Sequence, residues 1–205
     1  MSIIVFYPIV YINKQINQRT GEEKMVIKDR NLYLYGEIEE KSIKEINSEL
    51  LNLLIQDKEN EESQKNFKRK PINIFIDSYG GKVYDCLSLI DLITFSKTPI
   101  YTYCSGYAMS CGFLIFISGA KRFIGNYATL MCHQISGRLD FKITDIEESL
   151  TEYKRIESVI NSIITTKTKI TPTQLKQNRD GKTDWYINAS DAMKLGCADE
   201  ILMNI

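Results

Sequence analysis

The most informative stretch of the sequence is Gly106-Tyr107-Ala108-Met109-Ser110-Cys111-Gly112, which leads directly into the apolar residues 113–117. A serine between small residues, placed where a strand gives way to a helix, presents its hydroxyl on an exposed turn. The N-terminus of the following helix favours the negative charge that develops when such a hydroxyl acts as a nucleophile. The stretch therefore predicts a strand–turn–helix unit of an α/β protein, with Ser110 as its candidate nucleophile.

Two features outside this stretch fit a serine nucleophile. His133 is the only histidine of the chain and directly follows a short predicted strand, residues 129–132. The pair Gly80-Gly81 directly follows a buried predicted strand, residues 72–76. Both features therefore lie at strand ends, where the sites of α/β proteins collect.

Acyl transfer by serine needs a base, an acid that orients the base, and backbone donors for the oxyanion. If Ser110 is the nucleophile, His133 is its base, because it is the only imidazole available. The N–H groups of Gly81 and Cys111 are the candidate oxyanion donors, since glycine lets a substrate approach the backbone closely. Six aspartates near predicted loop ends could be the orienting acid, and chemistry alone does not choose between them: Asp77, Asp140, Asp145, Asp180, Asp184 and Asp191.

These residues also have simpler explanations. A single histidine is more often a surface or hydrogen-bonded core residue, and a serine beside glycine is more often part of a plain turn. A cysteine nucleophile is a further alternative, because Cys111 adjoins Ser110 and Cys132 adjoins His133. Neighbouring side chains point in different directions, however, so Ser110 and Cys111 cannot both face His133. We therefore expect both thiols to be small core residues.

The composition is that of one ordinary globular domain. The chain has 205 residues, of which 43% are hydrophobic and 25% charged, and 26 basic side chains balance 26 acidic ones. This balance favours neither nucleic acid nor a membrane surface as a partner. The five cysteines are odd in number and contain no CxxC, so we expect no disulfide framework, no structural metal site and a reducing compartment.

The apolar N-terminus does not fit a targeting segment. Residues 2–12 lack a basic leader and are interrupted by Pro8, and Lys14 follows too soon for a membrane span. We interpret them as two short strands or a surface hairpin, followed by an exposed hairpin tip or mobile loop at residues 13–30. The default localisation is the cytoplasm.

The rest of the chain alternates strands with helices, which predicts an α/β fold with parallel pairing. Capping boxes at Ser42 and Thr144 open two amphipathic helices, and the charged run at residues 56–70 predicts a solvated loop. The remaining expected elements are strands at residues 31–36, 72–76, 99–104 and 129–132, a turn at 77–81, and helices at 83–96, from Thr171-Pro172 and at 190–195.

Six motifs, in this order, carry a family resemblance. They are Ile76-Asp-Ser-Tyr-Gly-Gly81, Ala108-Met-Ser-Cys-Gly112, Met131-Cys-His-Gln134, Thr144-Asp-Ile-Glu147, Asp184-Trp-Tyr-Ile187 and Gly196-Cys-Ala-Asp-Glu-Ile201. From about Asn31 to Leu202 the chain resembles the ClpP-type serine peptidases. The spellings SYGG, AMSCG and TDWY are most similar to the divergent branch carried by bacteriophages, which would place the protein in the host cytoplasm.

The resemblance implies a crotonase-like fold of ββα units in a single domain, residues 1–205. Residues 1–30 would be a divergent N-terminal pore or hairpin segment, and residues 31–142 the head. Residues 143–168 would form a long protruding handle helix that interleaves two stacked heptameric rings, and residues 169–205 would complete the head.

The resemblance also assigns roles. It places the nucleophile at Ser110, the base at His133, the orienting acid at Asp184 and the oxyanion donors at Gly81 and Cys111. It implies no cofactor and no metal. The substrate would be unfolded polypeptide delivered by a separate AAA+ Clp unfoldase, which alone would use ATP, because this chain has no GxxxxGK[ST] motif. The segment at residues 135–142 could pair its backbone with an extended substrate.

The chain departs from the family pattern at several positions. Ile135 stands where the family has proline, Cys111 where it has methionine, and Thr183 where it has a basic residue before the acid. Thr183 affects the expected contact between rings, because the family uses the basic residue near that contact. Phe75 and Phe95 match apolar positions of the family's ATPase-docking cleft, whereas Asn73 replaces an aromatic residue and makes the match partial.

Two alternatives to an active peptidase stay open at this point. The chain could be a structural ring subunit that forms hetero-oligomers with homologous host subunits and modifies their specificity. It could also be an acyl-CoA enzyme of the crotonase superfamily, which shares the ββα fold and a two-amide oxyanion hole.

Overall fold

The computed structural model describes residues 12–16, 23–27, 30–135, 146–181 and 183–202. Its elements up to the middle of the chain are, in order, β1 (Ile12–Ile16), β2 (Glu23–Ile27), β3 (Asn31–Ile38), α1 (Glu40–Ser63), β4 (Ile72–Gly81), α2 (Val83–Phe95), β5 (Ile100–Cys104) and β6 (Tyr107–Met109). The later elements are α3 (Cys111–Ser118), β7 (Lys121–Gly125), β8 (Thr129–Cys132), α4 (Ile146–Lys167), α5 (Pro172–Gly181), β9 (Trp185–Asn188), α6 (Ala189–Lys194) and β10 (Glu200–Leu202). The predicted mixed α/β fold is confirmed.

The main sheet is organised around β4. Its strand order is β10-β7-β5-β4-β6-β8-β9, with β3 paired to β4 as well. The described pairings in this sheet are parallel except that between β8 and β9, which is antiparallel. The first half of β4 pairs with β5, whereas Ser78, nearer its end, pairs with Ala108 of β6. The sheet therefore divides along β4, and the β6 branch leads directly to Ser110.

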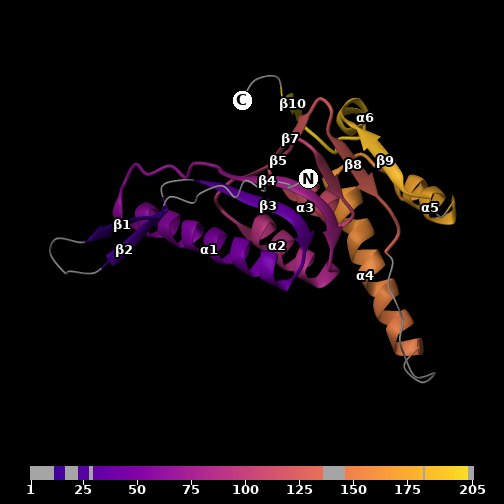
Figure 1. Cartoon of the computed structure of the whole chain (residues 1–205), viewed down its shortest axis with the longest axis horizontal. Coiled ribbons are helices and arrows are strands. Elements are labelled where there is room, and N and C mark those ends of the chain that lie inside the picture. Colours follow the sequence, from indigo (N-terminus) through magenta and orange to yellow (C-terminus); the bar gives the residue numbers. More distant parts are fainter. Residues whose placement is uncertain (1–11, 17–22, 28–29, 136–145, 182, 203–205) are drawn as a thin grey trace, which may run out of the picture.

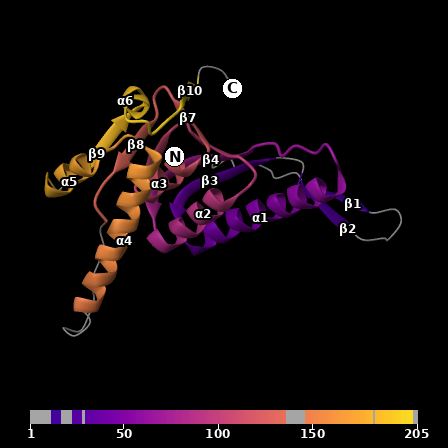
Figure 2. The same ribbon diagram turned by 180° about the vertical axis from the view of Figure 1, so that it is seen from behind.

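The core lies between the sheet and its helices. Along β4, buried and more exposed residues alternate, as expected for a strand with one covered face. Helices α1 and α2 run side by side along the sheet in both views (Figures 1 and 2). Every residue of α3 is buried, because α3 is enclosed by α2, α4 and the strands β4 and β6. Burying side chains such as Phe113 and Phe116 stabilises the fold by about 2–3 kcal/mol each.

The first long helix differs from the prediction at both ends. Helix α1 begins at Glu40 with Glu39 as its N-cap, and Ser42 is the N3 residue whose side chain completes the capping box. The helix also continues to Ser63, so the loop predicted at residues 56–70 is wrong over 56–63. Local composition suggests a solvated segment, but a tertiary ion pair fixes this end of the helix.

That ion pair joins Arg30 to Asp57. Asp57 is only 1% exposed and accepts two hydrogen bonds from Arg30, at 2.9 and 2.7 Å. The hydroxyl of Thr98 donates a third, at 2.7 Å. Burial alone would raise the pKa of Asp57, but these hydrogen bonds and the charge of Arg30 lower it below the usual value. The last turns of α1 are therefore anchored to the start of β3 and the entry to β5.

Other boundaries differ from the prediction as well. The turn predicted at residues 77–81 is the last part of β4, and β3 extends to Ile38 because it pairs with β4 up to Ile38 and Gly81. Strands β1 and β2 form an antiparallel hairpin with Ile12 opposite Ile27, in the region predicted as a hairpin tip or loop. The strands predicted before Ile12 and the capping box at Thr144 lie outside the described residues.

Helix α4 leaves the body of the molecule. Figures 1 and 2 show its N-terminal end farthest from the sheet, while its C-terminal part lies against the core. Ile156 and Ile164 are buried there, whereas Leu150, nearer the free end, is 50% exposed. Within the described residues, no helix combines the length and apolarity needed to cross a lipid bilayer.

Candidate functional site

Ser110 occupies a sharp turn between β6 and α3, where it is the N-cap of α3. Its backbone has φ 52° and ψ −118°, and it is the only non-glycine residue with positive φ in the described part of the chain. Such a conformation costs about 1–3 kcal/mol and persists only where the surroundings enforce it. Here the N–H of Ser110 donates to the carbonyl of Met131 on β8, at 2.9 Å. The turn thus holds the serine hydroxyl above the start of a buried helix.

His133 reaches Ser110 through the pairing of β6 with β8. Met109 lies opposite Met131 in this parallel pair, so the residues that follow the two strands lie together. The Nε2 atom of His133 is 2.8 Å from the Oγ atom of Ser110, a hydrogen-bonding distance. The predicted nucleophile and base are therefore in contact.

Asp184 approaches His133 through the antiparallel pairing of β8 with β9. Cys132 lies opposite Trp185, which places the residue before β9 beside the residue after β8. The Oδ1 atom of Asp184 is 3.7 Å from the Nδ1 atom of His133, within ion-pair range but longer than a hydrogen bond. Asp184 is therefore the aspartate placed to orient the imidazole, through a looser contact than the one between histidine and serine.

Three of the other candidate acids have structural partners. Asp77 accepts from the backbone N–H of Tyr107, Asp180 pairs with Lys176, and Asp191 lies in the first turn of α6, where it accepts from Lys194. Asp140 and Asp145 lie outside the described residues. Of the described candidates, Asp184 is the one whose carboxylate forms an ion pair with His133.

The two glycines lie directly against the serine turn. Both have positive φ, +105° for Gly80 and +151° for Gly81, which favours glycine. A Cβ atom on Gly80 would be 2.8 Å from the Cβ of Ser110 and 3.1 Å from the backbone nitrogen of Cys111. A Cβ on Gly81 would collide with the carbonyl of Ile38. Only glycine therefore allows the end of β4 to lie so close to both β3 and the turn.

The N–H of Cys111 is at the first position of α3, where a helix offers no internal acceptor for it. Together with the nearby N–H of Gly81, it could stabilise a negative oxygen beside Ser110. The predicted oxyanion donors are thus brought to the same place as the predicted nucleophile.

The cysteine alternative fits the geometry less well. The thiol of Cys111 donates to the carbonyl of Gly81 at 3.2 Å, and the thiol of Cys86 donates to the carbonyl of Cys111 at 3.4 Å. Hydrogen bonding with Cys86 lowers the pKa of Cys111, but the residue is only 2% exposed. Burial raises the pKa of Cys132 to about 12, which keeps it a thiol. All five cysteines are free and buried, which includes Cys111 and Cys132, the two predicted to be core residues.

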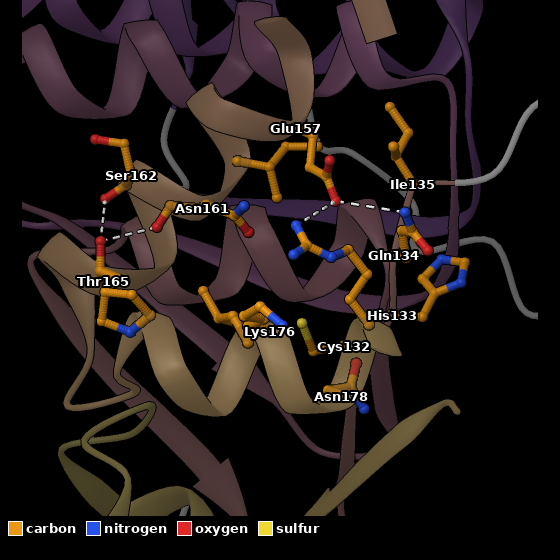
Figure 3. Close-up of a pocket in the computed structure, with 14 residues that line it drawn as sticks. Cys132, His133, Gln134, Ile135, Glu157, Asn161, Ser162, Thr165, Lys176 and Asn178 are labelled. Carbon is orange, nitrogen blue, oxygen red and sulfur yellow. Dashed lines mark hydrogen bonds and ion pairs between the residues drawn. The ribbon is translucent and has the colours of Figure 1, made fainter. Parts of the chain in front are cut away.

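A cavity of about 290 Å³ opens beside Ser110 and His133. Its apolar walls include Phe113, Leu114 and Ile160. It shares His133 and Ile160 with a second cavity of about 500 Å³ between α4 and α5. Figure 3 shows that second cavity, in which Glu157 accepts from Gln134 and pairs with Arg179.

A third cavity, of about 390 Å³, continues the first along the start of α2 and the face of α4. The two share Gly81, Val83 and Ile135, so they form one groove past the serine turn. The sequence predicts that the α4 residues in this groove belong to the apolar face of a helix. It does not predict the groove, because the spacing of apolar residues shows that a helix face is covered but not what lies against it. Tyr79, which also lines the cavity beside Ser110, has no sequence signal beyond its place before the two glycines.

The described residues contain no group of three histidine, cysteine, aspartate or glutamate side chains that could hold a metal ion. The chemistry that the arrangement can perform with its own groups is nucleophilic attack by a hydroxyl with general-base assistance.

Comparisons with known proteins agree with this chemistry. The sequence model of the family described as Clp protease matches residues 15–204. Among solved structures, that of a mutant of ClpP1 from Listeria monocytogenes is similar to this chain, with a TM-score of 0.71 and 27% sequence identity. That similarity covers 85% of this chain and 92% of the other. Both comparisons favour a peptidase over the acyl-CoA alternative.

Proposed function

Because this chain belongs to the Clp protease family, we propose that it is a serine endopeptidase subunit of a self-compartmentalised ring protease that hydrolyses unfolded polypeptides. The observation that carries the proposal is the 2.8 Å contact between Ser110 Oγ and His133 Nε2. This contact occurs at a strained turn beside a cavity, where a hydroxyl is exposed for attack.

The reaction follows from the positions of the groups. His133 accepts the proton of Ser110 as Oγ attacks the scissile carbonyl, and the resulting oxyanion accepts hydrogen bonds from the N–H groups of Gly81 and Cys111. His133 then gives the proton to the leaving amine, which breaks the peptide bond and leaves an ester on Ser110. Water, activated by His133, hydrolyses the ester by the reverse sequence. Asp184 orients the imidazole and stabilises its positive charge.

The cavity beside Ser110 would take the side chain before the scissile bond. Phe113, Leu114 and Ile160 line it, and burial of an apolar side chain there is favourable irrespective of the rest of the substrate sequence. This broad preference suits an enzyme that acts on many unfolded chains.

The proposed partner is an AAA+ Clp unfoldase of the host cytoplasm, which would deliver substrate to rings of this subunit. An aromatic row on the open face of the sheet is a candidate docking surface: Tyr33, Phe75, Tyr103 and Phe123 stack in succession with centroid separations of 5.4, 4.7 and 4.6 Å. Phe95 at the end of α2 is 81% exposed. Exposed aromatic surface of this kind marks a protein contact.

Labelling with a fluorophosphonate tests the catalytic proposal. The reagent forms a bond to an activated serine, so we expect the wild-type protein to be labelled and Ser110→Ala to lose the label completely. Ser105→Ala, which removes an exposed hydroxyl from the preceding turn, is the matched control and should label normally. Label that persists in Ser110→Ala would contradict the assignment.

The 3.7 Å separation between His133 and Asp184 favours a second candidate function, in which the subunit is weakly catalytic or structural and modifies the specificity of mixed rings that it forms with homologous host subunits. In that case the isolated protein would label slowly. Mixed rings would keep their activity when Ser110→Ala replaces the wild-type chain.

A further inference from the structure

We propose that Tyr79, stacked on Tyr107, forms a binding subsite for an aromatic side chain directly after the scissile bond. The proposal rests on the peptidase function above and specifies the substrate residue that this chain prefers on the leaving-group side.

Tyr79 is placed to contact substrate. It lines the same cavity as Ser110 and His133, and it is 68% exposed. Its ring lies 4.1 Å from that of Tyr107 between centroids, at an interplanar angle of 29°. An exposed ring that is already stacked on a second ring still offers surface to a third.

The sheet fixes this pair in place. Ser78 pairs with Ala108, so the residues on either side of each, Tyr79 and Tyr107 among them, project from the same face of the sheet. The backbone N–H of Tyr107 also donates to Asp77, at 3.1 Å. The stack is therefore built on rigid strands, and a ligand would not have to order it.

The positions of Tyr79 and of the groove relative to Ser110 indicate which side of the scissile bond lies beside Tyr79. Beyond Gly81, the chain continues through Val83 and Tyr84, and the groove follows it towards Tyr153 of α4. A substrate that runs antiparallel to the end of β4, with its scissile carbonyl at Gly81, places its earlier residues beyond Gly81, towards Val83 at the start of α2. The residue after the scissile bond then lies beside Tyr79.

The chemistry of the subsite favours a flat aromatic side chain. Aromatic rings prefer offset stacking, and the gain beyond ordinary apolar contact corresponds to a preference of about three- to tenfold. An acidic side chain would be disfavoured, because Asp77 lies on the same face.

The experiment measures how the acyl-enzyme divides between two amine acceptors. A peptide ester first acylates Ser110, and then phenylalaninamide and alaninamide compete to attack the ester. In each attack an N–C bond forms, the serine C–O bond breaks, and the amine proton passes through His133 to Ser110. Because both acceptors share one acyl-enzyme, their product ratio does not depend on how fast the acyl-enzyme forms.

We expect the wild-type protein to favour phenylalaninamide over alaninamide by at least about three- to tenfold, because the aromatic side chain also buries more apolar area than a methyl group. Tyr79→Ala should bring the ratio close to one, Tyr79→Leu should give a value between these because it keeps apolar area, and Tyr79→Phe should keep the wild-type ratio. Tyr127→Ala is the matched control, since Tyr127 is 93% exposed and is not among the residues that line the cavity.

The outcomes separate the subsite from the peptidase function. A wild-type protein that does not react with fluorophosphonate refutes the peptidase proposal. A protein that labels normally but keeps its acceptor ratio in both Tyr79→Ala and Tyr79→Leu refutes the subsite alone. If the Tyr79 variants change the mass of the particle but keep the ratio of the two amide products, the Tyr79 side chain forms a contact between subunits. That result also overturns the proposal.

Discussion

At the scale of single residues, the site depends on backbone that only particular side chains permit. Gly81 and Gly36 both have positive φ, but they differ in their surroundings. A Cβ on Gly81 would collide with the carbonyl of Ile38, whereas a Cβ on Gly36 would meet nothing within 4 Å. Alanine substitutions at these two glycines therefore separate two effects: backbone strain, which both would cause, and displacement of an oxyanion donor, which only the substitution at Gly81 would cause.

Gly81→Ala should therefore lower the rate of fluorophosphonate labelling by about 10²–10³-fold, the usual effect of losing one oxyanion donor. The collision with Ile38 must move the end of β4 away from Ser110. Gly36→Ala is the control and should lower stability by about 1–2 kcal/mol without a comparable loss of rate. Labelling rates and urea unfolding of both variants check this. Equal losses of rate in the two variants would show that strain, and not the donor, matters.

The sequence predicts some of these residues better than others. Ser110 and His133 can be inferred from chemistry, since each is distinctive in type and position. Asp184 cannot, because six aspartates lie near predicted loop ends, and only the family resemblance selects it. The contact that distinguishes it is created by the pairing of β8 with β9, which brings Cys132 opposite Trp185. Tyr79 is missed because its exposure depends on the register between β4 and β6.

At the scale of elements, the strands that deliver the site are predicted more accurately than their ends. The short strand predicted before His133 is present as β8, and the strand predicted at residues 99–104 is present as β5, whereas β6, which lies between β5 and Ser110, is not predicted. The turn predicted at residues 77–81 is strand because β3 and β6 supply partners on its two sides, which local glycine content cannot reveal. The end of α1 is misjudged for a similar reason, since a charged segment can be helical when a tertiary partner anchors it.

The anchor of α1 predicts a pH-dependent loss of stability. Asp57→Ala should lower the free energy of unfolding by about 3 kcal/mol at pH 7, because it leaves the Arg30 guanidinium partly buried without its partner. The folded-state pKa of Asp57 is lowered, so its contribution is complete above the unfolded value of about 3.9 and disappears as pH falls through the lower folded value. Urea unfolding of both proteins at pH 7 and pH 3 should thus show a difference that shrinks with acid.

Glu62→Ala serves as the control for this measurement. Glu62 lies on the same helix and pairs with Lys58, but both side chains are about 70% exposed. Its removal should change stability little at either pH. A difference for Asp57→Ala that does not shrink at low pH would mean that packing, and not the charge, anchors the helix.

At the scale of the whole molecule, the projecting helix α4 leaves apolar surface uncovered in the single chain. Helix α4 carries apolar surface away from the core, with Leu150 half exposed near its free end (Figure 1). Apolar side chains on a projecting helix are expected to be covered in an assembly. The sequence predicts the pairing of rings less clearly than the fold, because Thr183 replaces the basic residue that the family uses near that contact.

If α4 joins two rings, Leu150→Asp should halve the particle mass in sedimentation velocity, because a charge in a buried contact is strongly unfavourable. Single rings would remain if the contacts within each ring lie elsewhere on the subunit. Glu148→Ala, at an exposed position on the opposite side of α4, should leave the mass unchanged. A Leu150→Asp particle of wild-type mass would exclude this helix face from the contact between rings.

The left-handed backbone at Ser110 has a consequence for how such proteins diverge. Glycine would adopt this turn without strain, so a serine-to-glycine change would remove the reactive group and relieve the backbone in the same step. Loss of chemistry at this position therefore need not weaken the fold, as loss at Gly81 would. A lineage that no longer needs hydrolysis could keep its subunit as a durable building block, one substitution away from the enzyme it came from.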